Sequence, residues 1–271
     1  MWVRVPAAKI GVQVGGAFID YPVLVAFYSD VVKLFVLIKI GHAKTMKLLL
    51  FDIDGTLVMS GGAGKRAMNR AFEQLYGHKN ILNDISLSGR TDDLILRDAF
   101  RKSGMNMTLS ALEAYKKVYF KVVEKEMHIP NHKKRIMPGI SRLLPALHEQ
   151  ETVYLGLLTG NWQKSGYTKI RHFDLDRYFP FGAFSDDSSD RSALVPVAVQ
   201  RFTERHGVHP HPQDVYVIGD TPRDVTAAKP HNVKTVAVAA ALYSMDELAK
   251  SDPDYLFPDL SDFEKVMDVL G

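Results

Sequence analysis

Apolar and polar positions alternate along the chain in blocks that predict strands and helices in turn. The stretches that read as strands are 48–51, 153–158, 181–184, 215–219 and 233–239. Helical spacing of apolar residues predicts helices at 140–148, 164–173, 194–206, from 223, near 246–250 and from 262. An unbroken run such as Leu48 to Phe51 is typical of a strand buried on both faces, as in parallel sheets. We therefore expect an α/β fold with a doubly wound parallel sheet.

Between the first strand and residue 136 the pattern is helical instead. Apolar residues in 67–76 share one helical face and stop at a glycine. Thr91 is expected to cap a second helix with two aspartates in its first turn, and Ser110 a third. The basic run at 131–135 is interpreted as a solvated loop. We therefore predict three parts: an α-helical insertion at 60–135, an α/β core at 46–59 and 136–271, and an N-terminal extension at 1–45.

The N-terminal extension is apolar, but Asp20, Asp30 and Lys33 interrupt it. A membrane-spanning helix needs about 20 predominantly apolar residues, and charges near its middle are costly. The segment matches a signal peptide weakly. We favour a start at Met46, directly before the first core strand, and assign the extension no function. An enzyme tethered to a membrane through these residues is the rival interpretation.

Composition limits the partners and the metal ligands that are expected for this chain. The chain of 271 residues has a net charge of +3 without a dense basic tract, so no nucleic acid partner is expected. It has no cysteine, which excludes disulfides and thiolate metal sites and fits a reducing cytoplasm. A metal here must use carboxylate, carbonyl or imidazole ligands, and such ligands favour a hard cation such as Mg²⁺.

Two aspartates follow the first apolar strand, in the order Asp52, Ile53, Asp54, Gly55. As a plain turn, Asp54 and Gly55 would reverse the chain and Asp52 would act as a cap. That interpretation gives Asp52 no clear purpose, because charges are seldom buried without a partner. The alternative is a carboxylate pair at the carboxyl end of a parallel strand, where open α/β sheets bind their ligands.

Two later strands also end in polar residues. One precedes Thr159, Gly160 and Asn161, which form either a compact anion site or an ordinary helix cap. Another precedes Asp220, and Asp224 follows at the start of a helix. If these strands are neighbours, the carboxylates of the chain converge. Converging carboxylates repel one another unless a cation binds between them, so a Mg²⁺ site is the simplest interpretation.

With these three motifs the chain, from Met46 to Gly271, resembles the haloacid dehalogenase-like hydrolases, in their branch of phosphoglycolate phosphatases and β-phosphoglucomutases. The resemblance implies a Rossmann-like core and a phosphatase reaction. Asp52 would attack phosphorus and form an aspartyl-phosphate. Asp54 would act as general acid and then as general base. Mg²⁺ would be held by Asp52, the Asp54 carbonyl and Asp220, with Asp224 in support.

The resemblance also implies residues that bind the phosphoryl group. Thr159 would bind its oxygens as a catalytic residue, and the remaining substrate-binding set would be Gly55, Thr56, Gly160 and Asn161. The family usually supplies a lysine followed by proline for charge neutralisation, and this chain has no such pair between the second and third motifs. Arg191 is the favoured replacement, with Lys164 and Lys169 as rivals. We expect Lys169 to be an exposed helix residue.

The helical insertion resembles the cap domain of this family, which covers the site. Arg90, in its loop, is either a ligand for a substrate carboxylate or hydroxyl or a surface residue beside a helix cap. The expected function is therefore Mg²⁺-dependent hydrolysis of a small phosphomonoester, of the phosphoglycolate or sugar phosphate class. The alternatives are a phosphomutase of the β-phosphoglucomutase type and a non-catalytic relative that binds a phosphorylated ligand.

Overall fold

The computed structural model describes residues 9–14, 17–22, 24–25, 36–37 and 46–271. Met46–Gly271 is one compact unit and Met1–Thr45 is another. In the latter, two antiparallel pairs are described, formed by β1 (Lys9–Val14) with β2 (Ala17–Pro22), and β3 (Leu24–Val25) with β4 (Val36–Leu37). The apolar run at 23–40 lies mostly outside the described residues. Among the helices that are described, none has the length and hydrophobicity to cross a membrane.

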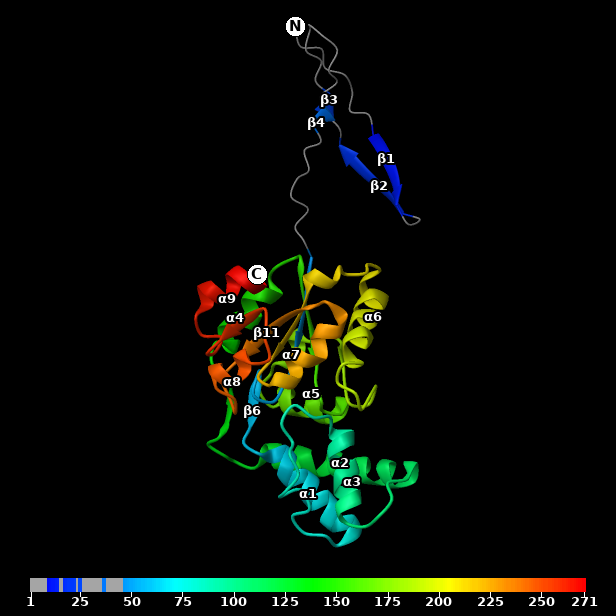
Figure 1. Cartoon of the computed structure of the whole chain (residues 1–271), viewed down its shortest axis with the longest axis vertical. Helices are drawn as coiled ribbons and strands as arrows, with labels where there is room; N and C mark the ends of the chain where they lie inside the picture. The colour runs from blue at the N-terminus through cyan, green and yellow to red at the C-terminus, as the bar shows by residue number, and fades with distance from the viewer. Residues whose placement is uncertain (1–8, 15–16, 23, 26–35, 38–45) are drawn as a thin grey trace, which may run out of the picture. The chain divides into compact units, whose positions relative to one another are not determined.

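A six-stranded parallel sheet forms the centre of Met46–Gly271 (Figure 1). Its strands, in spatial order, are β12 (Tyr255–Phe257), β11 (Lys234–Val238), β10 (Val215–Gly219), β5 (Lys47–Phe51), β8 (Val153–Leu158) and β9 (Gly182–Ala183). From β5 the chain proceeds outward through β8 and β9, then crosses to β10 and proceeds outward the other way. This order confirms the predicted doubly wound sheet and places its switch point beside β5.

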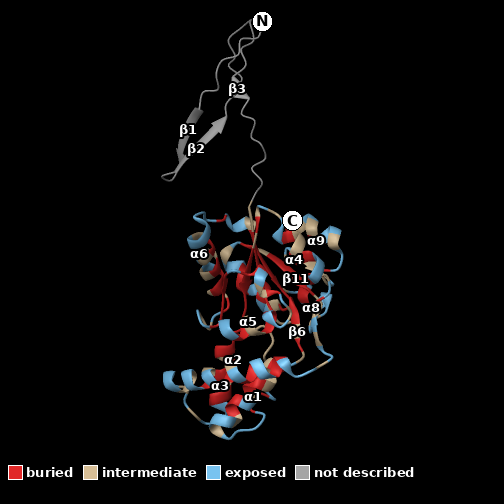
Figure 2. Ribbon diagram, turned by 180° about the vertical axis from the view of Figure 1, so that it is seen from behind, coloured by how far each residue is buried: buried red, intermediate tan, exposed pale blue. Residues whose placement is uncertain are grey.

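Alternate residues of β5 enter two different hydrophobic clusters, because successive side chains of a strand point to opposite faces. Leu49 and Phe51 pack in one cluster, and Leu48 and Leu50 in the other; all four are fully buried. The first face is covered by α4 (Ile140–His148), α5 (Gln163–Arg171) and α9 (Phe263–Leu270). The second is covered by α6 (Leu194–His206), α7 (Pro222–Ala228) and α8 (Met245–Ala249). Figure 2 shows the buried strands inside helices whose outer sides are exposed.

The helical insertion, residues 61–133, holds a separate hydrophobic cluster. Its helices are α1 (Ala63–Tyr76), α2 (Asp92–Lys102) and α3 (Leu109–His128), gathered at one end of the sheet in Figure 1. The Phe72 ring lies near the centre of this cluster, with its centroid 5.3 Å from that of Phe100 and 6.2 Å from that of Tyr115. Trp162, from the loop after β8, joins the same cluster, so the insertion packs against the end of the sheet.

Two predictions for this region were wrong. The cap of α3 is Thr108, whose side chain accepts a hydrogen bond from the Ala111 amide, and Ser110 lies inside the helix. The run at 131–135 is not a solvated loop throughout, because β7 (Lys134–Ile136) pairs antiparallel with β6 (Val58–Ser60). Lys134 donates from its ammonium group to three carbonyl oxygens at the end of α3, at 2.6–2.7 Å. Those carbonyls lack helical partners, so a lysine there is stabilising.

Element bounds elsewhere follow the predictions closely. The strands at 153–158 and 215–219 and the helices at 140–148 and 194–206 form as predicted. The strand predicted at 181–184 shortens to β9, and β12 was not predicted. Three short 3-10 helices complete the described structure, at Asp176–Tyr178, Pro212–Asp214 and Lys229–His231.

Candidate active site

The three predicted motifs meet at one edge of the sheet. Asp52 and Asp54 follow β5, Asn161 follows β8, and Asp220 follows β10. β5 is hydrogen-bonded to β8 on one side and to β10 on the other, all in parallel. Because parallel strands end at the same edge, residues far apart in the sequence become neighbours at the switch point.

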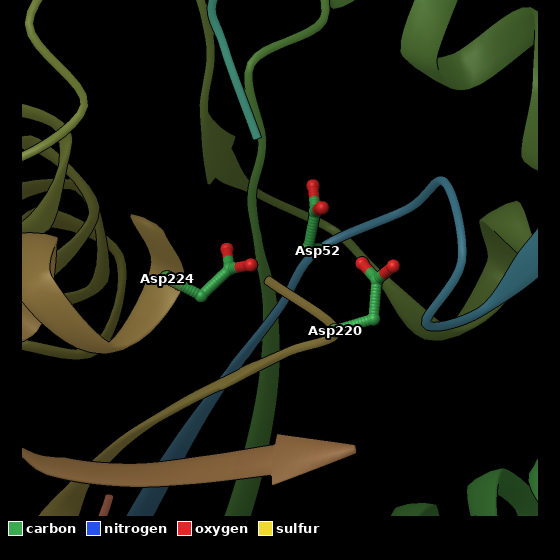
Figure 3. Close-up of side chains that lie close together, drawn as sticks. All are labelled: Asp52, Asp220 and Asp224. Carbon is green, nitrogen blue, oxygen red and sulfur yellow. The ribbon is translucent and has the colours of Figure 1, made fainter. Parts of the chain in front are cut away.

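Three buried carboxylates converge there. Asp52, Asp220 and Asp224 each offer one oxygen, and these oxygens lie within 4.8 Å of one another. Figure 3 shows Asp224 reaching from the first turn of α7 toward Asp52 and Asp220. Thr221 fixes Asp224 by donating from its amide (3.0 Å) and its hydroxyl (2.7 Å) to Oδ2. The capping box of α7 therefore sets the direction of this carboxylate.

Arg191 lies against two of these carboxylates. Its Nη2 is 3.2 Å from Oδ1 of Asp52 and makes a shorter contact with Oδ1 of Asp224. The guanidinium is buried, and burial alone would lower the pKa of Arg191, but the charges of Asp224 and Asp52 raise it above its ordinary value. Arg191, the cation favoured from the sequence, is therefore in direct contact with Asp52.

One guanidinium does not balance three carboxylates. Burial, with the charges of Asp224 and Asp52, raises the pKa of Asp220 to about 8. Burial also raises the pKa of Asp52 to about 6, although Arg191 acts in the opposite direction. The Asp220 carboxylate accepts one long hydrogen bond, from the Thr56 hydroxyl at 3.4 Å. Buried, repelling and weakly bonded oxygens of this kind fit a hard divalent cation.

Gly55 permits this close arrangement. It adopts a φ of +89°, which side chains other than glycine rarely adopt, and a β-carbon there would overlap the Asp220 carboxylate. A side chain at position 55 would therefore push the loop after β5 away from the end of β10. Gly160 is similarly crowded, since a β-carbon would overlap the carbonyl of Arg90. The two glycines let core loops approach the acidic cluster and the insertion.

Lys169 lies in this site, contrary to the prediction of an exposed helix lysine. It is 5% exposed, and its Nζ lies 2.5 Å from Oδ2 of Asp54 and 2.6 Å from Oδ1 of Asn161. Partial burial acts to raise the pKa of Asp54, but the Lys169 charge and hydrogen bonds from Lys169, Asn161 and Ser60 lower it overall. The sequence holds one signal: Lys169 follows Ser165 by four residues and precedes Ile170, on the inward side of α5.

Thr159 and Asn161 are buried beside this pair. The Asn161 amide nitrogen Nδ2 donates to Oδ2 of Asp54 and to Oγ1 of Thr159, both at 2.9 Å. The second motif is therefore joined to the first through side chains as well as through strand pairing. Lys164, the other rival cation, is exposed, and its Nζ lies 5.6 Å from the Phe120 ring centroid.

The loop before α2 docks onto the core. Asp92 donates from its amide to the carbonyl of Gly160 (2.7 Å), and its carboxylate accepts from the Trp162 amide (2.9 Å) and the Ser165 hydroxyl (3.3 Å). Burial raises the pKa of Asp92 to about 6, although Lys169 acts to lower it. Asp92 was predicted as an ordinary first-turn residue, and its position in α2 gave no signal for these contacts.

Arg90 belongs to the same loop and lines the cleft described below. Its Nη2 lies 2.6 Å from Oδ2 of Asp98, and its Nη1 donates to the carbonyl of Ser86 at 3.1 Å. The guanidinium is therefore already paired within the helical insertion. The proposed role of Arg90 in holding a substrate group stays a prediction.

A cleft of about 380 Å³ opens over these residues. The core supplies three of its acidic residues, Asp52, Asp54 and Asp220. The insertion supplies mainly apolar wall residues, together with one further cation: Met68, Leu87, Ile95, Tyr119 and Lys65. A cleft with an apolar wall and a few convergent polar groups is the usual form of a small-molecule site.

Known proteins resemble the chain along most of its length. The sequence model of the haloacid dehalogenase-like hydrolases matches residues 49–238. A phosphoglycolate phosphatase from Aquifex aeolicus is 25% identical over 228 residues, covering 82% of this chain and 97% of that protein. A pyrophosphatase, PpaX, from Bacillus pumilus is 23% identical over 231 residues, covering 82% and 96%.

Solved structures share the fold. One described as a predicted phosphoglycolate phosphatase from Haemophilus somnus superposes with a TM-score of 0.62 at 20% sequence identity, over 83% of this chain and 99% of that one. Identity at this level supports the architecture alone.

Proposed function

Because this chain belongs to the haloacid dehalogenase-like hydrolase family, we propose that it is a Mg²⁺-dependent phosphatase acting on a small phosphomonoester. The observation that carries the proposal is the convergence of Asp52, Asp220 and Asp224 beside a single arginine, with Asp54 two residues away. Metal-free, that cluster is short of positive charge. A dianionic phosphate ester and a divalent cation together would complete it.

In this proposal Asp52 is the nucleophile. An oxygen of Asp52 bonds to phosphorus while the ester bond breaks, which gives an aspartyl-phosphate and the free alcohol. Asp54 gives a proton to the leaving oxygen, then takes a proton from the water that attacks the aspartyl-phosphate. That second step releases inorganic phosphate and restores Asp52.

The cation is assigned from the donor set. Asp52, the backbone carbonyl of Asp54 and Asp220 would hold Mg²⁺, with Asp224 in support, and the bound ion would offset the negative charge of the transferring phosphoryl group. Asp224 is already held by Thr221 and Arg191, so a supporting role suits it better than a direct one.

The phosphoryl oxygens would be bound by Thr159 and by the amides near Gly55, Thr56, Gly160 and Asn161. Arg191 would neutralise the phosphoryl group in place of a lysine, since it already contacts the proposed nucleophile. Residues 60–135, which include the helical insertion, would serve as a cap over the core formed by 46–59 and 136–271.

The cations that line the cleft indicate which kind of leaving group it would bind. Of the cations that line it, Arg90 is paired with Asp98, Lys169 with Asp54, and Arg191 with Asp52 and Asp224. Lys65 also lines the cleft, and among the described residues no ion pair is formed with it. This arrangement favours a leaving group with its own negative charge, as in phosphoglycolate, over an uncharged sugar.

The test is phosphate release from a panel containing phosphoglycolate, hexose phosphates, pyrophosphate and p-nitrophenyl phosphate. We expect turnover with Mg²⁺, loss of turnover with chelator, and a preference for phosphoglycolate over hexose phosphates. Asp52→Asn should lose at least about 10³-fold in kcat, because the amide cannot form the intermediate. Acid-quenched protein should carry phosphate in the wild type and not in Asp52→Asn.

Other outcomes would redirect the assignment. Folded wild type that binds Mg²⁺ and a phosphorylated compound without releasing phosphate would favour the non-catalytic relative. Isomerisation of a sugar phosphate without net phosphate release would favour the phosphomutase. Turnover that survives Asp52→Asn would contradict the assigned nucleophile.

A further inference from the structure

Lys169 is a buried lysine whose ammonium group has two strong partners. Its Nζ lies 2.5 Å from Oδ2 of Asp54 and 2.6 Å from Oδ1 of Asn161. The three residues come from different segments, the loop after β5, the loop after β8 and helix α5. A buried lysine is costly unless it is paired and hydrogen-bonded, and this one is both.

The Asp54 carboxylate is held mainly through one oxygen. Oδ2 accepts from Lys169 and from the Asn161 amide at 2.9 Å, whereas Oδ1 accepts one long hydrogen bond, from the Ser60 hydroxyl at 3.4 Å. The Asp54 side chain is 40% exposed, so packing does little to fix it. Without Lys169 the carboxylate would keep one firm donor and could rotate about its bond to Cβ.

Lys169 and Arg191 divide the positive charge of the site. Arg191 contacts Asp52 and Asp224, while Lys169 forms its ion pair with Asp54. Asn161 is shared between Lys169 and Thr159, so Lys169 also steadies the loop after β8. The two cations therefore face different carboxylates and should affect different parts of a reaction.

We propose that Lys169 is a positioning residue that orients Asp54 for proton transfer, an inference that rests on the proposed phosphatase function. In the first step Asp52 bonds to phosphorus, the ester bond breaks, and Asp54 gives the leaving oxygen the proton that it took from water in the preceding turnover. In the second step water bonds to phosphorus, its proton passes to Asp54, and the bond from Asp52 to phosphorus breaks. Lys169 acts through Asp54 in both steps and touches neither substrate nor phosphorus.

The leaving group of the substrate decides whether the first step depends on Asp54, so the two steps can be tested separately. p-Nitrophenolate leaves without needing a proton, so the first step with p-nitrophenyl phosphate does not depend on Asp54. Hydrolysis of the aspartyl-phosphate still does. A disoriented Asp54 should therefore slow the second step selectively and make the intermediate accumulate. An alkyl phosphate should lose rate in both steps.

The experiment is rapid-mixing kinetics of Lys169→Met with p-nitrophenyl phosphate and Mg²⁺, with Lys164→Met as the matched control. Lys164 is on the same helix, is exposed and does not line the cleft. We expect Lys169→Met to release about one equivalent of p-nitrophenol in a burst, then to turn over roughly 10–100-fold more slowly than the wild type. Acid-quenched protein should be largely phosphorylated, and KM should change less than about threefold. Lys164→Met should behave as the wild type.

Lys169→Arg is the second variant, because it keeps the charge while moving the donors; we expect a smaller burst and a smaller loss of rate. It also keeps the test decisive if Lys169→Met does not fold, as judged by circular dichroism. A raised KM without a burst would overturn the proposal in favour of direct phosphate binding. Unchanged kcat with a lowered melting temperature would overturn it in favour of a structural ion pair. Wild type inactive on every phosphoester would instead refute the phosphatase function itself.

Discussion

Asp92 joins the helical insertion to the core through a buried carboxyl group. Its folded-state pKa of about 6 lies above the ordinary value of 3.8, because burial disfavours the charged form. The folded protein therefore binds this proton more tightly than the unfolded chain does. The stabilisation is fully present below about pH 4 and is lost as the pH rises through about 6.

We expect Asp92→Asn to remove this pH dependence while keeping an oxygen that accepts from the Trp162 amide. The free energy of unfolding of the wild type, relative to this variant, should fall by on the order of 3 kcal/mol between pH 4 and pH 7. Urea unfolding at several pH values measures it. The exposed Asp268 is a control site, and Asp268→Asn should parallel the wild type. Parallel curves for Asp92→Asn would show that the carboxyl does not titrate as inferred.

At the residue level, sequence reasoning found the groups that end strands. Asp52 and Asp220 directly follow unbroken apolar runs, so their burial could be predicted from the sequence, and their convergence was expected if the two strands are neighbours, as β5 and β10 are. Lys169 could not be found in this way. Its helix is polar overall, and its partners come from two other segments, so the pairing exists only after the sheet has assembled.

At the level of elements, β5 is the strand on which both faces of the sheet depend. Leu50 is fully buried in the cluster beneath α6, in the middle of β5. Leu50→Ala should lower the free energy of unfolding by about 2–5 kcal/mol, because it removes buried contacts and leaves a cavity. Leu75→Ala, at a position 37% exposed on α1, should cost about 1 kcal/mol or less. Equal losses in urea unfolding would contradict the assigned core.

The bounds of helices and strands were predicted correctly where the apolar pattern was long enough to establish its period. β8, β10, α4 and α6 have sustained apolar patterns, and their bounds were predicted correctly. β6, β7 and β12 have three residues each, too few to establish a period of two. Tertiary pairing creates them, so the sequence alone does not distinguish them from loops.

At the level of the molecule, every described hydrophobic cluster and the whole cleft lie within residues 46–271. We expect a variant that begins at Met46 to keep the melting temperature within about 2 °C and kcat within about twofold of the full chain. Calorimetry and the phosphate-release assay measure these quantities. A large loss of either would mean that the N-terminal extension contributes to folding or to the site.

The antiparallel pair β6 and β7 has a consequence for the order of folding. The chain enters the insertion after Ser60 and leaves it before Lys134, and these two residues face each other in the pair. The entropy lost on closing a loop grows with the number of unconstrained residues inside it. An insertion that folds around its own cluster brings its ends together, so β5 and β8 can then pair across a much shorter effective loop. Residues 61–133 would thus raise the folding rate of a sheet to which they contribute no strand.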